Sequence, residues 1–205
     1  MGTLVSRLLV RFHGGMAVDD RVREAMARVP RETFLPDNVR AHAAEDRPLP
    51  IGHGVTNSQP FTVRTMLELL DVRPGDSVLD VGAGSGWTTA ILAELVGPGG
   101  TVLGTERVAP LARTAAERVA FLGYRNADVI PALEGTLGAP EAGPFHRILV
   151  SAEARTLPQV LVDQLDDGGV LVLPVAGEML RVRRAGGEIT TTAHGRFAFV
   201  PLIEG

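Results

Sequence analysis

The segment Ser77-Val-Leu-Asp-Val-Gly-Ala-Gly-Ser-Gly-Trp87 constrains the fold of this chain more than any other stretch. Its apolar, β-favouring first half ends abruptly in glycines, and an apolar run with helical character, residues 87–96, follows at once. This pattern predicts a strand, a tight turn and the start of a helix. Glycines at the turn let a ligand approach the backbone, and the first N–H groups of the helix are free to bind it. The segment therefore predicts a ligand site at the turn.

The spacing of the glycines restricts the kind of ligand. Gly82, Gly84 and Gly86 alternate with Ala83 and Ser85, whereas the dinucleotide fingerprint separates its last two glycines by two residues. A P-loop is excluded as well, because it needs a lysine followed by serine or threonine and the chain contains no lysine. A nucleoside-type ligand without a pyrophosphate remains, and S-adenosylmethionine is the leading candidate.

Strand and helix patterns alternate along the rest of the chain. Periodicity and breakers predict helices at 21–29, 61–70, 87–96, 109–122 and 158–165. They predict strands at 77–81, 101–105, 128–131, 147–151, 170–175, 179–184 and 188–192, with a Gly-Gly hairpin turn before the last. Residues 30–60 predict a long loop. The expected fold class is α/β, a Rossmann-like methyltransferase fold with a mostly parallel, doubly wound sheet and a β-rich C-terminal end.

Length and composition bound the remaining properties. A chain of 205 residues predicts a single domain, in which residues 1–60 form an N-terminal helix and active-site loop region and residues 61–205 a cofactor-binding core. The net charge of −4 does not favour nucleic acid or an anionic membrane as a partner. The absence of cysteine excludes thiolate metal sites and a cysteine nucleophile. The N-terminus is too short and too interrupted by arginine for a signal peptide or membrane span, so we expect a cytoplasmic protein and, by default, a monomer.

Two acidic residues follow predicted strands and are candidates for binding a nucleoside. Glu106 follows the glycines by about 20 residues, where a carboxylate can accept both hydroxyls of a ribose. The alternative is a solvated carboxylate in the first turn of the next helix, where the helix dipole favours it. Glu134 and Gly135 follow the third strand, and a carboxylate there could hold the adenine amino group or belong to a plain turn.

A polar loop precedes the helix expected at 61–70. It contains Thr56, Asn57 and Ser58, and Ser58 is placed to cap that helix, to contact cofactor and acceptor, or to do both. His53 could line the same site, but no second histidine or carboxylate stands at a metal-binding spacing, so we expect no metal. The other histidines are expected at surface or hydrogen-bonded positions: His13, His42, His146 and His194.

Longer phrases in a fixed order add specificity to these motifs. They are Val29-Pro-Arg-Glu-Thr-Phe-Leu-Pro36, Glu45-Asp-Arg-Pro-Leu-Pro-Ile-Gly-His-Gly54, Thr56-Asn-Ser-Gln-Pro60, the glycines, Gly135-Thr-Leu-Gly138, Leu165-Asp-Asp-Gly-Gly169, Leu173-Pro-Val-Ala-Gly177 and Phe199-Val-Pro-Leu-Ile203. With them, the chain resembles the protein-L-isoaspartate (D-aspartate) O-methyltransferase family from about residue 29 to residue 204.

The resemblance implies methylation, by S-adenosylmethionine, of the free α-carboxyl of L-isoaspartyl residues in damaged peptides or proteins, which starts repair through a succinimide. Ser58 stands at the active-site serine of the family, and it is expected to orient the acceptor because a carboxylate is already ionised at pH 7. The cofactor contacts implied are Thr56, Ser58, Asp80, Gly82, Ala83, Gly84, Ser85, Gly86, Glu106, Arg107, Glu134 and Gly135. The acceptor contacts implied are His53, Val55, Asn57, Ala152, Glu153 and Arg155.

Several positions depart from the family pattern. Val55 stands where a polar residue is common, Asn57 replaces an apolar residue, and Glu134 lengthens a usual aspartate. Near the acceptor site, Glu153 could repel a carboxylate, and Arg155 could offset this or clamp the carboxylate, unless both point to solvent and pair with each other. Three functions stay open: general isoaspartyl repair, the same chemistry on an aspartate of a dedicated biosynthetic peptide, and a cofactor-binding protein that has lost catalysis.

Overall fold

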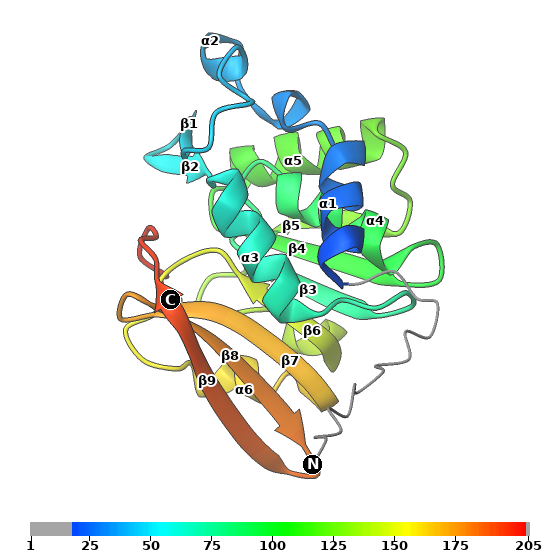
Figure 1. Cartoon of the computed structure of the whole chain (residues 1–205), viewed down its shortest axis with the longest axis vertical. Helices are drawn as coiled ribbons and strands as arrows, with labels where there is room; N and C mark the ends of the chain where they lie inside the picture. The colour runs from blue at the N-terminus through cyan, green and yellow to red at the C-terminus, as the bar shows by residue number, and fades with distance from the viewer. Residues whose placement is uncertain (1–17, 204–205) are drawn as a thin grey trace, which may run out of the picture.

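The computed structural model describes residues 18–203, and its centre is a seven-stranded sheet (Figure 1). In chain order the strands are β3 (Ser77–Val81), β4 (Thr101–Glu106), β5 (Ala127–Pro131), β6 (Phe145–Val150), β7 (Leu165–Val175), β8 (Glu178–Ala185) and β9 (Glu188–Arg196). Across the sheet the order is β5-β4-β3-β6-β7-β8-β9. The first five strands in this order are parallel, and β7, β8 and β9 are antiparallel neighbours. The predicted mostly parallel sheet with a C-terminal hairpin is therefore confirmed.

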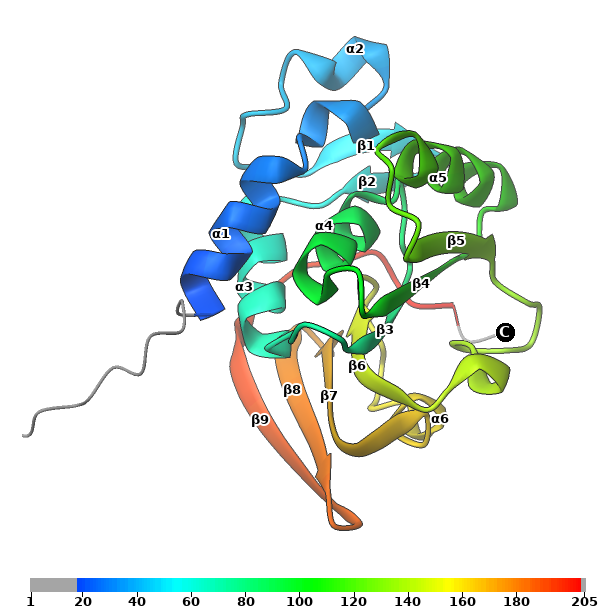
Figure 2. The same cartoon turned by 90° about the vertical axis from the view of Figure 1, so that its right-hand side faces the viewer.

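Helices cover the two faces of the sheet unequally (Figure 2). The helices of the larger layer are α1 (Val18–Arg28), α3 (Pro60–Leu70), α4 (Trp87–Val96) and α5 (Ala109–Phe121). The opposite face is covered by the short helix α6 (Gln159–Val162) and by loops. Side chains of each strand alternate between the layers, so Val78 packs with the larger layer and Leu79 with the smaller one. Both faces are therefore buried, which explains the apolar runs in the central strands.

The chain reverses its direction across the sheet at β3. From β3 it proceeds to β4 and β5 on one side and then returns to β6 on the other side. Ligands of open α/β sheets bind at such a switch point, beyond the carboxyl ends of the strands. Because β3 and α4 have the bounds predicted from the sequence, the glycine loop between them, residues 82–86, lies at this point.

The stretch 30–60, expected to be mostly loop, contains more regular structure than predicted. It forms the 3-10 helix η1 (Arg31–Phe34), the one-turn helix α2 (Asp37–Arg40) and an antiparallel hairpin of β1 (Leu49–Gly52) and β2 (Val55–Asn57). These elements are too short for a periodic pattern of apolar residues. The side chain of Arg31, described below, adds hydrogen bonds to carbonyl groups 12 to 16 residues further along the chain, which no local pattern indicates.

The prediction for residues 158–165 is wrong at its C-terminal end. The helix α6 ends at Val162, and Leu165 already begins β7. The Gly168-Gly169 pair lies within that strand, at an irregularity where its register against β6 shifts. Gly168 has a φ of 80°, which glycine tolerates and which lets the strand bend without ending.

The expected cap of α3 is wrong as well. Gln59 occupies the N-cap position without a side-chain hydrogen bond to the helix, and Ser58 precedes it. The carboxylate of Asp46 supplies the cap from a distance, because its Oδ1 accepts the N–H of Phe61 at 2.9 Å. Gln59 binds the same carboxylate through Nε2 at 3.1 Å. A remote acidic side chain thus replaces the local serine.

Candidate active site

The glycine loop turns tightly between β3 and α4. Gly82, Gly84 and Gly86 have φ values of 78°, 57° and 89°, a region that L side chains rarely adopt. A Cβ atom at Gly86 would also lie 3.1 Å from the Cβ of Ala115 and 3.2 Å from its carbonyl oxygen. Gly86 therefore serves the close packing of α4 on α5, whereas Gly82 and Gly84 face an open cavity.

Glu106 ends β4 beside the glycine loop and is fixed by backbone groups. One carboxylate oxygen accepts the N–H of Gly84 at 2.9 Å, and the other accepts the N–H of Val108 at 2.8 Å. The side chain is 7% exposed, so the alternative of a solvated carboxylate is wrong. Each oxygen retains a further lone pair, so both can still accept a ribose hydroxyl. That contact stays a prediction.

A cavity of about 610 Å³ opens over the carboxyl ends of β3, β4 and β6. Cofactor sites have volumes of roughly 300–1,000 Å³, so a nucleoside cofactor fits. The walls come from the β1–β2 hairpin, the glycine loop, the loops that follow β4, β5 and β6, and the chain after β9. The predicted site residues that line it are His53, Val55, Thr56, Gly82, Gly84, Glu106, Arg107, Glu134, Gly135 and Ala152.

The other predicted site residues do not line this cavity. They are Asn57, Ser58, Asp80, Ala83, Ser85, Gly86, Glu153 and Arg155. Ala83 and Ser85 are buried in the glycine loop, and Ser58 is half-buried just beyond the cavity-lining Thr56. Their direct contacts with a cofactor or acceptor stay predictions.

One wall of the cavity contains none of the predicted site residues. Residues 200–203, which follow β9, line it together with Leu137, Gly138 and Ser151. The backbone of Glu153 holds this tail, because its N–H donates to Val200 at 2.8 Å and its carbonyl accepts from Leu202 at 2.7 Å. The phrase 199–203 belongs to the family similarity and was the one signal in the sequence that could have pointed to the tail.

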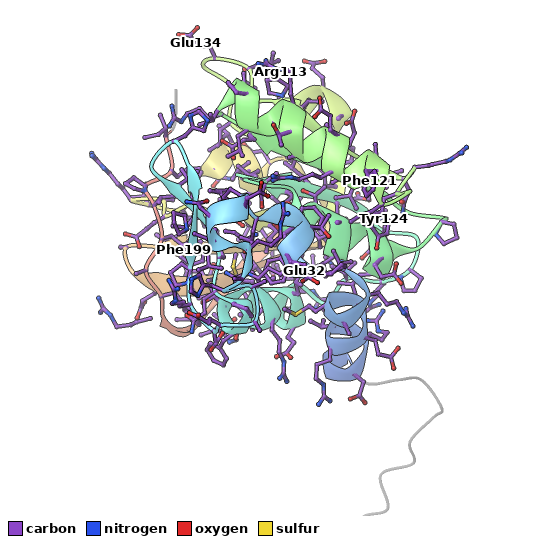
Figure 3. The ribbon with its side chains drawn as sticks, turned by 90° about the horizontal axis from the view of Figure 1, so that it is seen from above. Glu32, Arg113, Phe121, Tyr124, Glu134 and Phe199 are labelled. Carbon is purple, nitrogen blue, oxygen red and sulfur yellow. The ribbon has the colours of Figure 1, made fainter. Side chains whose placement is uncertain are left out.

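Glu134 lies at the outer edge of the site. Figure 3 shows it at the far end of the loop that follows β5, with its side chain pointing away from the rest of the structure. The side chain is exposed, although the residue belongs to the cavity wall. Its neighbour Gly135 has a φ of 71°, which shapes the turn of this loop. An adenine contact by Glu134 stays a prediction.

The histidines outside the hairpin have local partners. Nδ1 of His146 accepts the N–H of Ser77 at 2.9 Å, His42 pairs with Glu45, and His194 contacts the hydroxyl of Thr192. His13 lies outside the described residues. Within residues 18–203, no three acidic or histidine side chains gather as a metal site would require. The helices of that range also include none long and apolar enough to cross a bilayer.

Arg31 is a buried guanidinium that anchors the hairpin wall. Its nitrogens donate at 2.8–3.3 Å to the carbonyl oxygens of Ala43, Glu45, Arg47, Asn57 and Ser58. It also lies 5.4 Å from the ring centre of Trp87, the first residue of α4. Burial lowers the pKa of Arg31, an effect that the nearby carboxylate of Asp46 opposes. One side chain thus joins the polar loop to the helix that follows the glycines.

Asp80 is the penultimate residue of β3, close to the glycine loop, and is fully buried. Oδ2 accepts the hydroxyl of Thr89 at 2.7 Å, whereas Oδ1 has no partner among the described residues. Burial raises the pKa of Asp80 to about 6, the hydroxyls of Thr89 and Thr88 oppose this shift, and the charge of Glu106 adds to it. Ionisation of Asp80 is therefore less favourable in the folded protein than in the unfolded chain.

We expect Asp80→Asn to stabilise the cofactor-free protein in a pH-dependent way. A pKa raised by folding gives stability that is complete below about pH 4 and is lost as the pH rises through about 6. The asparagine variant has no such loss, so its advantage in free energy of unfolding should grow by about 2.5 kcal/mol between pH 4 and pH 8. Urea unfolding at both pH values measures this, with the exposed Asp128→Asn as control. An equal difference at both pH values would contradict the buried charge.

We expect Glu106→Gln to weaken cofactor binding. The amide cannot accept with both ends, so it loses one backbone N–H partner and one charge-assisted bond to a ribose hydroxyl. The loss should be about 10- to 100-fold in the dissociation constant of S-adenosylhomocysteine, measured by titration calorimetry. Glu141→Gln changes an exposed residue that does not line the cavity, and this variant should bind S-adenosylhomocysteine as tightly as the parent does. Unchanged affinity in the Glu106 variant would remove Glu106 from the site.

The parallel sheet, its switch point, the glycine loop and the buried carboxylate of Glu106 define a Rossmann-like S-adenosylmethionine-dependent methyltransferase. The model of the family described as protein-L-isoaspartate(D-aspartate) O-methyltransferase matches residues 6–205. This chain therefore belongs to the protein-L-isoaspartate (D-aspartate) O-methyltransferase family.

Individual relatives agree with this membership. A protein-L-isoaspartate O-methyltransferase from Aeropyrum pernix is 46% identical over 194 residues, which cover 92% of this chain and 75% of the relative. One from Methanopyrus kandleri is 44% identical over 203 residues, which cover 96% and 90%. A crystal structure from Plasmodium falciparum, described as a protein-L-isoaspartate O-methyltransferase in complex with S-adenosyl-L-homocysteine, matches this chain with a TM-score of 0.81 and 28% identity. The match covers 91% of each chain.

Proposed function

We propose that this chain transfers the methyl group of S-adenosylmethionine to the free carboxylate of L-isoaspartyl residues in damaged peptides or proteins, and so starts their repair through a succinimide. The observation that carries the proposal is the single cavity that joins Gly82, Gly84 and Glu106 to the hairpin with Thr56. A cofactor at the glycines and an acceptor at the hairpin share one space there. Membership of the family supplies the chemistry that fits this arrangement.

The proposed reaction asks little of the protein beyond alignment. A carboxyl group with a pKa near 4 is ionised at pH 7, so no base is needed to create the nucleophile. The cofactor supplies an electrophilic methyl group, which bonds to the carboxylate oxygen as its carbon–sulfur bond breaks. Holding the two reactants in line can lower the activation free energy by several kcal/mol, and by roughly 7–11 kcal/mol in the best cases.

In this proposal the two ends of the cavity have different tasks. Glu106 holds the ribose and the glycine loop faces the methionine part of the cofactor. Thr56, exposed on β2, and Ser58 orient the carboxylate of the acceptor. The carbonyl oxygen of Ser58 accepts from Arg31 at 2.8 Å, so the backbone of this loop is held before any substrate binds.

Labelled cofactor and matched peptides test the function directly. The peptides have one sequence and contain isoaspartate, aspartate or neither at one position. We expect base-labile label on the isoaspartyl peptide and background label on the other two. Label on the aspartyl peptide alone would replace this function by dedicated aspartate methylation, and label on no peptide, despite cofactor binding, would leave a protein without this catalysis.

Ser58→Ala tests the role given to the serine. Loss of one orienting hydrogen bond should lower kcat about 10- to 100-fold and leave the dissociation constant of S-adenosylhomocysteine nearly unchanged. Steady-state kinetics with the isoaspartyl peptide and calorimetry measure the two quantities. Ser77→Ala, at the far end of β3, is the matched control. Full turnover in Ser58→Ala would exclude Ser58 from acceptor orientation.

The structure offers less support for a dedicated aspartyl substrate than the sequence does. That alternative rests on the altered acceptor region, in which the largest change is the pair of charges at Glu153 and Arg155, and neither of these two residues lines the cavity. Glu153 instead supports the cavity-lining tail through its backbone, and Arg155 is exposed. We therefore favour general isoaspartyl repair, by a single-domain monomer in the cytoplasm, over the dedicated substrate.

A further inference from the structure

Asn57 lies in the middle of the acceptor loop, residues 56–58, and its side chain turns away from the cavity. Thr56 lines the cavity, whereas Asn57 is 4% exposed and does not. Successive side chains of a strand point to opposite sides, so the end of β2 that presents Thr56 sends Asn57 inward. The residue was expected to touch the acceptor, yet its amide is committed elsewhere.

The oxygen and the nitrogen of the Asn57 side-chain amide each have a hydrogen-bond partner. Oδ1 accepts from Nε of Arg31 at 2.7 Å, and Nδ2 donates to Oγ of Ser85 at 3.1 Å. The orientation of the amide is fixed because arginine can only donate. Ser85 is 2% exposed and belongs to the glycine loop. A single buried amide therefore connects the arginine anchor, the acceptor loop and the cofactor loop.

We propose that Asn57 is a positioning residue that sets the acceptor loop against the cofactor loop through Ser85. The inference rests on the proposed function, since it concerns the alignment of donor and acceptor in that reaction. An apolar side chain here would leave Nε of Arg31 and the hydroxyl of Ser85 without this partner inside the protein. Buried polar groups are costly when unpaired, so the two loops would separate or admit water.

Three variants distinguish positioning from simple stability. Asn57→Leu keeps the size and removes both bonds, so kcat with the isoaspartyl peptide should fall about 10- to 100-fold, while the dissociation constant of S-adenosylhomocysteine changes less than about threefold. Asn57→Asp keeps an acceptor for Arg31 and lets the Ser85 hydroxyl donate, so kcat should stay within about threefold of the parent. Asn38→Leu, at an exposed position of α2, controls for the added apolar side chain.

The pair with Ser85 gives the test of mechanism. The single variant Ser85→Ala should lower kcat. Adding Asn57→Leu to it should lower kcat little further, because both changes break the same connection. Losses that multiply would overturn the coupling. So would an Asn57→Leu variant that is less stable to urea but turns over like the parent.

A second readout does not require turnover. In the parent protein, binding of S-adenosylhomocysteine should slow amide hydrogen exchange in residues 49–59, because the glycine loop holds the hairpin through Asn57. This protection should be lost in Asn57→Leu and in Ser85→Ala, and kept in Asn57→Asp. If Asn57→Leu does not fold, the other two variants decide the question, and unchanged protection in Ser85→Ala overturns it. If the parent methylates no peptide, the proposed function fails, while the exchange data still decide the coupling.

Discussion

The buried guanidinium of Arg31 is the interaction on which the site depends. The hairpin packs on a small apolar cluster that includes Leu35, Leu49 and Ile51, but the irregular chain around it is held by hydrogen bonds to one side chain. Arg31 supplies them to five carbonyl oxygens and adds a contact with the ring of Trp87. A buried charge is costly to leave unpaired, by about 3–5 kcal/mol when partners are removed. A path of the segment that removed these carbonyl oxygens from Arg31 would leave the buried charge without them.

The sheet supplies the other half of the site through its topology. The switch at β3 opens a crevice, and glycines with positive φ keep it free of side chains. Glu106 bridges the glycine loop and the start of α5 with its two oxygens, so the cofactor end of the cavity is organised by the protein alone. Arg31 and Asn57 then attach the acceptor loop to this frame. The proposed alignment of donor and acceptor rests on these two parts of the structure and on the buried polar contacts that join them.

Local patterns predicted the parts that local forces determine. The strand at β3 and the helix α4 have the predicted bounds, since a period of apolar residues ended by glycines decides both. The cap of α3 by Asp46, the hairpin held by Arg31 and the tail held by Glu153 depend on residues far apart in the chain, and propensity carries no such signal. Family phrases pointed to the right segments of the site. They did not show that Asn57 faces inward or that Glu153 and Arg155 stand outside the cavity.

A crystal structure with S-adenosylhomocysteine and an isoaspartyl peptide would test most directly whether one cavity aligns the methyl donor and the acceptor. We expect the ribose hydroxyls to bind Glu106 and the sulfur to lie over Gly82 and Gly84. We expect the isoaspartyl carboxylate beside Thr56 and Ser58. One of its oxygens should lie about 3–3.5 Å from the position that the methyl carbon of S-adenosylmethionine would occupy, in line with the bond from that carbon to sulfur. A peptide bound outside the cavity, or a carboxylate turned away from the sulfur, would contradict this alignment.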